Sequence, residues 1–408
     1  MSIDTTVPEL RYKEYSYAWE EKQLNQEVEL FSGLTYSPKD IRKDGVFVIR
    51  SSNVKNGQLV QADNVYVAPE VVNCNNVEKG DIVVVVRNGS RSLIGKHAQV
   101  NSYMDNTVIG AFMTGVRGKQ PEFINALFDT NQFTAQVDKN LGATINQITN
   151  GSFNSMAFKF PEDLEQAQIG TTFQKLDTLI NQHQQKHDKL SNVKKAMLEK
   201  MFPKQGETIP EVRFKKFCGE WVESSVAEEA IITTGFPFDS ADFSESSDLL
   251  VITNSNIQNN SSTVDGKIGN RIASKKVTLL NQYRLNSGDI LVTMDGSVGR
   301  TAKVVESNQI LAQRVGRLVA RKDIEFLYQS LNTGRFLESM TTISHGGTIK
   351  HISLSEIGSY LLQIPKDIEE QVKIGEYFKK LDNLITQHQQ QITKLKNIKQ
   401  ACLSKMFV

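Results

Sequence analysis

The sequence predicts an α+β protein, in which two similar domains of mixed α/β structure are joined by two long, antiparallel coiled-coil helices with an internal pseudo-two-fold duplication. Three observations predict this fold. Residues 169–202 recur at residues 374–407, with identical residues at 21 of 34 aligned positions. Both copies have the composition and apolar spacing of a long helix, and short motifs match on either side of them. One such repeat in a chain of 408 residues indicates two halves rather than a solenoid, whose repeats span roughly 20–50 residues.

The two copies read as helices because they lack proline and are rich in Lys, Leu, Gln, Met and Ala. Apolar residues recur at steps of three and four, which is the spacing of a coiled-coil seam. Each copy is therefore predicted to pack against the other, through Phe173, Leu176, Ile180, Leu190, Phe378, Leu381, Ile385 and Leu395. Polar residues interrupt both seams at the same positions, namely His183 and Lys194 in the first copy and His388 and Lys399 in the second. We interpret the histidines as hydrogen-bonded residues that fix the register.

Antiparallel packing makes two further predictions about the helices. Their midpoints should cross, so that residues 182–187 meet residues 387–392 and Phe173 lies near Met406. The apolar stripe is also wider than one partner helix can cover, which predicts an additional partner. The residues that widen it are Leu179, Val193, Leu198, Leu384, Ile398 and Leu403.

Domain boundaries follow from the repeat and from a Pro- and Gly-containing linker at residues 203–210. We expect the first domain at residues 1–160, the first long helix at 161–203, the second domain at 204–364 and the second long helix at 365–408. Runs of β-branched residues predict strands at 46–50, 65–68, 82–87, 249–253 and 290–294. Residues 123–136 and 324–339 read as helices.

Composition limits the location and chemistry of the protein. The chain lacks an apolar run of about 18 residues and a signal-peptide pattern at its start, so neither a membrane span nor secretion is expected. Three widely spaced cysteines favour a reducing cytosol, and the histidines and cysteines form no metal-ligand motif. Signatures of adenine methyltransferases, nucleases and GxSxG hydrolases are also missing, so the sequence predicts no catalytic residues.

The distribution of charge is more informative than the net charge of +1. Residues 267–322 contain eleven basic and three acidic residues, and residues 79–119 contain six and two. Local basic segments in a neutral chain fit binding to a polyanion on one face, although ordinary solvated charge explains them equally well.

Two glycine-containing loops follow predicted strands at equivalent places. Residues 89–97 resemble a nucleotide-binding P-loop but have five residues between the glycines and His97 where Ser or Thr should contact magnesium. The corresponding loop in the second half, residues 295–300, ends in the cation Arg300. In the first loop the cation Lys96 has the equivalent place, next to the last residue. Each loop could hold a phosphate through backbone N–H groups, or could be a tight turn with one exposed cation.

Polar residues that follow strands are candidates for contacts with DNA bases, because Asn pairs with adenine and Arg with guanine. Asn and Ser also form turns, which is the alternative for each of them. Together with the basic residues of the charged segments, the predicted DNA-binding residues are Arg50, Ser51, Asn53, Arg87, Asn88, Arg91, Lys96, Asn254, Asn256, Arg271, Lys275, Lys276, Arg300, Lys303, Thr348 and Lys350.

The chain resembles the specificity (S) subunit of a type I restriction–modification system. The resemblance rests on the duplicated helix ending LxKMF at residues 198–202 and 403–407, on the domain openings with Trp19 and Trp221, and on the G(A/G)TI segments at 142–145 and 346–349. It implies that two target-recognition domains each read one half of a split, asymmetric site in double-stranded DNA, with the half-sites about one helical turn apart.

The resemblance also implies the partners. The long helices would dock two methyltransferase (modification) subunits, and restriction subunits would join later. S-adenosylmethionine, ATP and Mg²⁺ would belong to those partners, so this chain is expected to carry no cofactor. Two other interpretations stay open, namely a coiled-coil scaffold that binds only protein and a self-sufficient enzyme built on the P-loop-like segment.

Overall fold

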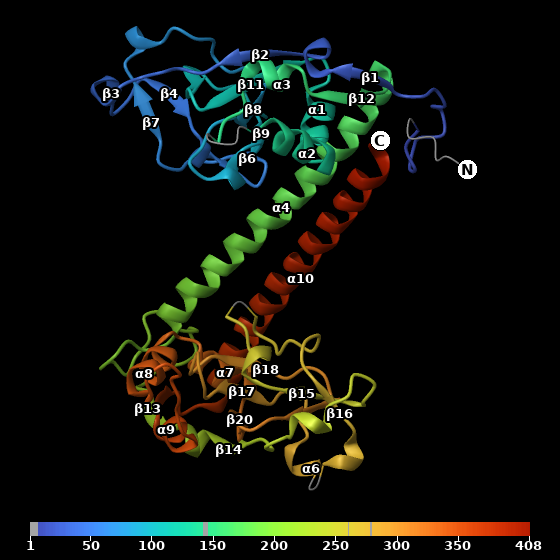
Figure 1. The fold of residues 1–408 in the computed structure, drawn as a ribbon. Coiled ribbons are helices and arrows are strands. Elements are labelled where there is room, and N and C mark those ends of the chain that lie inside the picture. Colours follow the sequence, from blue (N-terminus) through green and yellow to red (C-terminus); the bar gives the residue numbers. More distant parts are fainter. Residues whose placement is uncertain (1–6, 142–145, 260, 278–279) are drawn as a thin grey trace. The chain divides into compact units, whose positions relative to one another are not determined.

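The computed structural model describes residues 7–141, 146–259, 261–277 and 280–408 (Figure 1). The chain forms two compact units. Unit 1 comprises Met1–Gln184 and Gln390–Val408, and unit 2 comprises Gln185–Gln389. The motif predicted at residues 142–145 lies outside the described residues.

Unit 1 is built on short β-sheets. One four-stranded sheet has the order β2 (Val28–Ser32), β11 (Met113–Gly118), β8 (Ile82–Val85) and β9 (His97–Gln99). A second has the order β10 (Thr107–Ile109), β4 (Val46–Ile49), β7 (Val65–Val67) and β3 (Ile41–Arg42), with β10 parallel to β4. Two two-stranded sheets complete the unit. One pairs β1 (Glu20–Gln23) with β12 (Ala157–Phe160), and the other pairs β5 (Val54–Lys55) with β6 (Gln58–Leu59).

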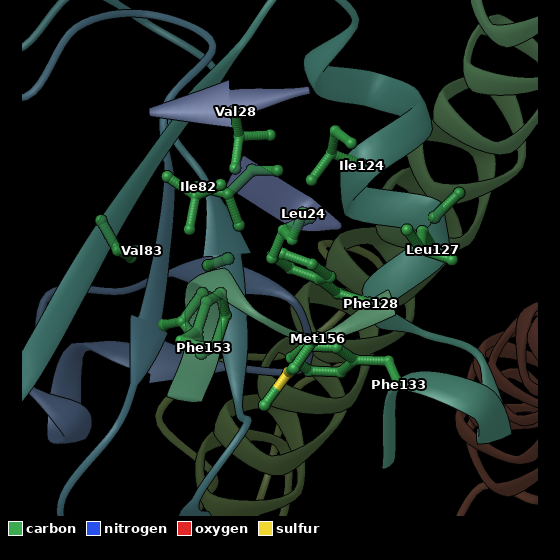
Figure 2. Close-up of a cluster of buried hydrophobic side chains, with 14 of the residues drawn as sticks. Leu24, Val28, Ile82, Val83, Ile124, Leu127, Phe128, Phe133, Phe153 and Met156 are labelled. Carbon is green, nitrogen blue, oxygen red and sulfur yellow. The ribbon is translucent and has the colours of Figure 1, made fainter. Parts of the chain in front are cut away.

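Three short helices cover the first of these sheets, α1 (Pro121–Phe128), α2 (Asn131–Asn140) and α3 (Asn150–Asn154) (Figure 1). Figure 2 shows apolar residues of these helices packed toward those of the strands, with Ile124 of α1 near Val28 of β2, and Phe128 beside Leu24 of the turn that precedes β2. The rings of Phe128 and Phe133 stack with their centroids 4.3 Å apart. Strand β8 is buried along its whole length, which explains its unbroken run of β-branched residues.

Unit 2 repeats this plan with different lengths. Its four-stranded sheet has the order β14 (Ala230–Thr234), β20 (Val315–Ala320), β17 (Ile290–Thr293) and β18 (Thr301–Lys303). A three-stranded sheet follows the order β16 (Arg271–Ile272), β15 (Leu249–Ile252) and β19 (Gln309–Leu311), with β19 parallel to β15. Strand β13 (Val222–Ser225) pairs with β21 (Leu361–Ile364). The short helices are α5 (Val226–Glu229), α6 (Leu280–Tyr283), α7 (Ile324–Leu331), α8 (Arg335–Ile343) and α9 (Leu354–Ser359). The five predicted strands are confirmed as β4, β7, β8, β15 and β17.

The two long helices are α4 (Asp163–Met201) and α10 (Ile368–Met406), and each contributes one half to each unit. In unit 1, Phe173 lies 5.8 Å from Phe407 between ring centroids, in the same apolar cluster as Met406. In unit 2, Phe202 lies 6.1 Å from Phe378.

Ion pairs give the direction of packing inside each unit. Asp177 contacts Lys399 at 2.5 Å in unit 1, and Lys194 contacts Asp382 at 2.6 Å in unit 2. Taken with the contacts Phe173–Phe407 in unit 1 and Phe202–Phe378 in unit 2, these pairs show residue numbers rising along one helix as they fall along the other within each unit. The paired helix segments are therefore antiparallel in both units, as predicted. The crossing of residues 182–187 with 387–392 stays a prediction.

Burial divides the predicted helix-packing residues into two groups. Phe173, Ile180, Phe378 and Leu381 are buried, whereas Leu176, Leu190, Ile385 and Leu395 are half-buried. Of the residues that widen the stripe, Leu198 and Leu403 are buried and Val193 is half-buried, but Leu179, Leu384 and Ile398 are exposed.

The stretches predicted as helices, residues 123–136 and 324–339, are confirmed as mainly helical, but each is divided between two helices. In unit 1 the break is made by Thr130, whose hydroxyl accepts the N–H of Phe133 at 3.2 Å and caps α2. In unit 2 the break falls at Gly334, whose φ of +93° ends the helical backbone before α8.

The sequence motifs that recur in both halves form the same structural contacts in both units. Trp19 packs edge-on against Phe407 at 6.0 Å, and Trp221 against Phe202 at 5.9 Å. Gly170 and Gly375 lie where the long helices pass close to α1 and α7. A Cβ atom at Gly170 would be 2.6 Å from the backbone nitrogen of Phe123, and one at Gly375 would be 2.9 Å from that of Phe326. The repeat therefore preserves a packing frame.

The segment PExR occurs at residues 8–11 and again at residues 210–213, and it forms a clamp in each unit. Arg11 makes two hydrogen bonds to the fully buried Glu165, at 2.8 and 2.7 Å, and Arg213 makes two bonds of 2.7 Å to the fully buried Glu370. The neighbouring backbone N–H groups of Leu10 and Val212 donate to carbonyl groups at the ends of α10 and α4. Each segment thus ties the start of one long helix to the end of the other within its unit.

Candidate nucleic-acid interface

In unit 1 the loop after β8 meets the turn after β4. Asn88 Nδ2 donates to Ser51 Oγ at 3.2 Å, and Lys96 Nζ donates to the carbonyl oxygen of Ser51 at 3.4 Å. Arg87 is exposed, with its guanidinium 5.0 Å from the ring centroid of Phe112. Four of the predicted DNA-binding residues therefore lie on one loop cluster at the end of these two strands.

Unit 2 has the corresponding loop cluster after β15 and β17. Asn254 Oδ1 accepts the N–H of Met294 at 3.3 Å, and Gly296 N–H donates to the carbonyl of Lys350 at 2.7 Å. Lys350 and Thr348 are exposed on a hairpin that is closed by hydrogen bonds between His345 and His351. Asn254, Thr348 and Lys350 are thus placed around one loop, residues 294–300.

The predicted base contacts of Asn53 and Asn256 are corrected, because in the structure both side chains hold a loop in place. Asn53 accepts the N–H of Arg50 at 2.9 Å and donates to the carbonyl of Ala62 at 2.7 Å. Asn256 donates to the carbonyl groups of Asp265 and Ile268, both at 2.8 Å. Both side chains are buried, so their amides hold the loop after a strand and are not available to a base.

The predicted DNA contact of Lys303 is also corrected. Its ammonium group contacts Glu325 at 2.5 Å and lies 4.6 Å from the ring centroid of Tyr328, with only 12% of the side chain exposed. A cation held in this way inside unit 2 cannot reach a phosphate on the surface.

The other predicted cations vary in their surroundings. Arg50 donates through Nη2 to the carbonyl of Asp63, and Arg271 reaches the carbonyl of Ser247 at 3.5 Å. Arg91 pairs with Asp138 at 3.5 Å and Lys276 with Asp242 at 3.0 Å, both on the surface. Lys275 is exposed and Arg300 half-buried. Exposed ion pairs contribute little to stability, so a polyanion can displace them.

The P-loop-like segment is not a nucleotide-binding loop. A P-loop joins a strand to a helix whose N-terminus faces the phosphates. Here residues 89–96 join β8 to another strand, β9, and His97 is buried with Nε2 3.5 Å from Asp129 Oδ1. The segment therefore lacks the helix and the magnesium-binding hydroxyl that nucleotide chemistry needs.

Sequence reasoning missed residues at the turn before the central strand of each unit. These are Phe112, just before β11, and Arg314, just before β20, and both are exposed. Their position is visible only when the two halves are aligned across the turn, where residues 110–112 correspond to residues 312–314.

A half-buried charge cluster fixes the loop-bearing domain of unit 1 to its helices. Lys399 Nζ lies 2.7 Å from Asp129 Oδ2 as well as 2.5 Å from Asp177 Oδ1. Burial acts to raise the pKa of Asp129, but His97 and Lys399 outweigh it and lower that pKa to about 2. Burial raises the pKa of Asp177 despite the opposing charge of Lys399.

We predict an acid-dependent loss of stability from Asp129. A carboxyl group with a lowered pKa stabilises the fold above its unfolded pKa of about 4, and the contribution, about 2 kcal/mol, disappears as the pH falls toward 2. Asp177 has the opposite sign, because its raised pKa reduces stability as the pH rises. Urea unfolding of unit 1, followed by Trp19 fluorescence in a Trp221→Phe background, should show a gap between wild type and Asp129→Asn that closes between pH 5 and 2. A pH-independent gap would contradict this.

Within the described part of the chain, none of the helices combines the length and apolarity needed to cross a bilayer. The described residues also contain no group of three or more His, Cys, Asp or Glu side chains placed to bind a metal ion.

Comparison with known proteins identifies the family. The type I restriction modification DNA specificity domain matches residues 17–192 and again residues 219–397. The chain is 29% identical over 174 residues to the type I restriction enzyme StySPI specificity subunit of Salmonella potsdam, covering 40% of this chain and 36% of that protein. It is 25% identical over 261 residues to the MjaVIII specificity subunit of Methanocaldococcus jannaschii, covering 60% and 59%. The alignments thus span between about a third and three-fifths of these relatives.

Solved structures support the same fold. The crystal structure of the type I restriction–modification S subunit from M. genitalium superposes with a TM-score of 0.66 at 15% identity, covering 98% of this chain and 99% of that one. At this identity the likeness concerns the fold alone. Because the domain family matches one segment in each half and together most of the residues, this chain belongs to the type I restriction modification DNA specificity family.

Proposed function

We propose that this chain is the DNA-recognition subunit of a type I restriction–modification complex and that its two units each read one half of a split, asymmetric site in double-stranded DNA. Specificity subunits are the non-catalytic recognition subunits of such systems. The observation that carries the proposal is a repeated frame with different loops. Both units share the Trp, Arg–Glu and glycine contacts described above, but they carry different residues on the loop clusters after their strands.

The exposed basic residues of both units fit DNA. Exposed Arg87 and Arg91 in unit 1, and exposed Lys275, Arg314 and Lys350 in unit 2, can contact phosphates or bases. Since the chain as a whole is neutral, with a net charge of +1, we infer that partner subunits supply much of the salt-dependent, nonspecific affinity.

The proposal is tested by exchanging one recognition domain. Residues 8–160 are replaced by the matching domain of a related subunit, the chain is co-expressed with its methyltransferase subunit, and methylated adenines are mapped on host DNA. We expect one half of the methylated site to change and the other half to stay the same. A change in both halves together would contradict separate reading by the two units.

We also propose that the long helices dock methyltransferase subunits, with restriction subunits joining the assembled complex, and that S-adenosylmethionine, ATP and Mg²⁺ bind to those partners. Support comes from the apolar side chains that remain exposed on the helices. Leu179 and Ile398 are exposed in unit 1 and Leu384 in unit 2, although each lies on a stripe that is otherwise buried or half-buried.

The docking proposal predicts a loss of partner binding. The double variant Leu179→Glu, Ile398→Glu should fail to co-purify with the methyltransferase subunit, because it places charges in an apolar contact. The matched variant Lys186→Glu, Lys396→Glu changes two polar residues of the same helices and should co-purify normally. Equal co-purification of both variants would exclude this face of the helices as the docking surface.

A further inference from the structure

Once the shared frame is set aside, the two units differ most sharply at one corner of the loop cluster. In unit 1 this corner lies between the end of β8 and the turn before β11. In unit 2 it lies between the end of β17 and the turn before β20. In unit 1 the carbonyl of Phe112 accepts the N–H of Arg87 at 3.2 Å. In unit 2 the carbonyl of Arg314 accepts the N–H of Met294, the residue before Asp295, at 3.3 Å. We call Arg87 with Phe112, and Asp295 with Arg314, the strand-end pairs.

The pair in unit 2 is an oriented guanidinium at the surface. Arg314 Nη1 lies 2.9 Å from Asp295 Oδ2. The arginine side chain is 67% exposed, whereas the aspartate side chain is 19% exposed and therefore provides a fixed anchor. Arg314 also has a φ of +68°, a left-handed conformation that residues other than glycine rarely adopt. A bulky residue kept in such a conformation at an exposed turn points to a functional constraint.

The chemistry of this pair fits a particular base. A guanidinium has five N–H donors in a planar fork, so the contact through Nη1 leaves donors free to act together on a ligand. Guanine presents two acceptors, O6 and N7, side by side in the major groove, and bidentate arginine is their usual partner. An aspartate that holds the guanidinium in one plane reduces the entropy lost when both bonds form.

The surroundings of the pair are suited to a polyanion. Asp295 forms a β-bridge with His351 at the base of the hairpin that carries Lys350. The carbonyl oxygen of Lys350 accepts the N–H of Gly296, the residue after Asp295, and the side chain of Lys350 is exposed. A phosphate contact by Lys350 would set the distance of this corner from the DNA backbone, as phosphate contacts do in other complexes.

We propose that Arg314, positioned by Asp295, reads a guanine in the half-site bound by unit 2. This inference rests on the proposed function. Unit 1 presents different chemistry at the same corner, because its guanidinium comes from the strand end, Arg87, and lies over the aromatic ring of Phe112 at 5.0 Å. The two corners therefore present their guanidinium groups from different positions and with different neighbours, as an asymmetric site requires.

The test uses the complex of the full chain with its methyltransferase subunit. Methylated sites are mapped for wild type, Arg314→Ala, Arg314→Lys and the control Arg321→Ala. Arg321 is an exposed arginine directly after β20, whereas Arg314 directly precedes the same strand. We expect Arg314→Ala and Arg314→Lys to accept other bases at one guanine of one half-site, with discrimination reduced about 5- to 150-fold. Arg321→Ala should keep the wild-type site.

Binding of the purified complexes to duplexes covers the case in which a variant no longer methylates. Replacing the assigned guanine by 7-deazaguanine removes the N7 acceptor, and should weaken wild-type binding about fivefold or more while leaving binding by Arg314→Ala unchanged. Asp295→Asn should reduce discrimination at the same base pair.

Three results would overturn the inference: a unit 2 half-site without guanine, an unchanged site in Arg314→Ala, or equal sensitivity of wild type and Arg314→Ala to 7-deazaguanine. Absence of split methylation by the wild-type complex would instead refute the proposed function, so the two failures are distinguishable.

Discussion

Replacing Arg213 by alanine should lower the free energy of unfolding of unit 2 by about 3–5 kcal/mol, because it leaves the carboxylate of Glu370 buried without its partner. Arg213 makes two bonds of 2.7 Å to Glu370, and the carboxylate is fully buried. Equilibrium unfolding followed by Trp221 fluorescence, in a Trp19→Phe background, measures the change.

Two controls separate the buried ion pair from other effects of the substitution. Lys216 pairs with Glu369 at the surface of the same unit, so Lys216→Ala should cost less than about 1 kcal/mol. The double variant Arg213→Met, Glu370→Leu removes both charges and should recover most of the loss. If Arg213→Ala costs no more than Lys216→Ala, the PExR segment is not the clamp described above.

A chain truncated after Gln205 should form a symmetric dimer with a new DNA specificity. In the full chain, Leu403 and Met406 of α10 and the following Phe407 complete the core of unit 1. The fragment lacks them, but α4 and the residue after it carry the equivalent Leu198, Met201 and Phe202. A second copy of the fragment can supply these side chains through an antiparallel pair of identical helices, which gives an isologous dimer. Burial of each large apolar side chain contributes about 1.5–3 kcal/mol to that association.

Sedimentation and methylation mapping test the truncated chain. The dimer carries two identical recognition domains, so with methyltransferase subunits it should methylate an inverted repeat of one half-site. In the dimer, Lys194 of one copy takes the place of Lys399 beside Asp129 and Asp177 of the other. Lys194→Glu should therefore give a monomer, whereas Lys195→Glu, on the exposed side of the helix, should not. A wild-type fragment that stays monomeric at micromolar concentration would contradict the account.

The long helices were predictable because the duplication supplied two independent copies of one seam. Their antiparallel packing was predicted from the symmetry of the seam and from the family resemblance, and the contacts within each unit confirm it. The helices begin at Asp163 and Ile368, close to the predicted starts at residues 161 and 365 and before the repeated segments. The turns within residues 123–136 and 324–339 were missed because a single capping threonine or a single glycine interrupts an otherwise helical pattern.

The loop residues were harder to predict, since composition does not separate an exposed asparagine from a buried one. Asn88 and Asn53 both follow strands, but Asn53 turns inward and saturates its amide on loop carbonyls. Lys303 is in a basic segment yet pairs with Glu325, a partner 22 residues away that only the fold brings near. Arg314 escaped notice because its significance depends on its backbone conformation and on Asp295.

The central claim, that two units read two different half-sites, is tested most directly by mapping methylated adenines in cells that express the wild-type chain with its methyltransferase subunit. We expect one bipartite motif, with two short and different sequences separated by a spacer of fixed length and unspecified sequence. An undivided motif, a palindrome, or no sequence-specific methylation by the assembled complex would contradict the claim.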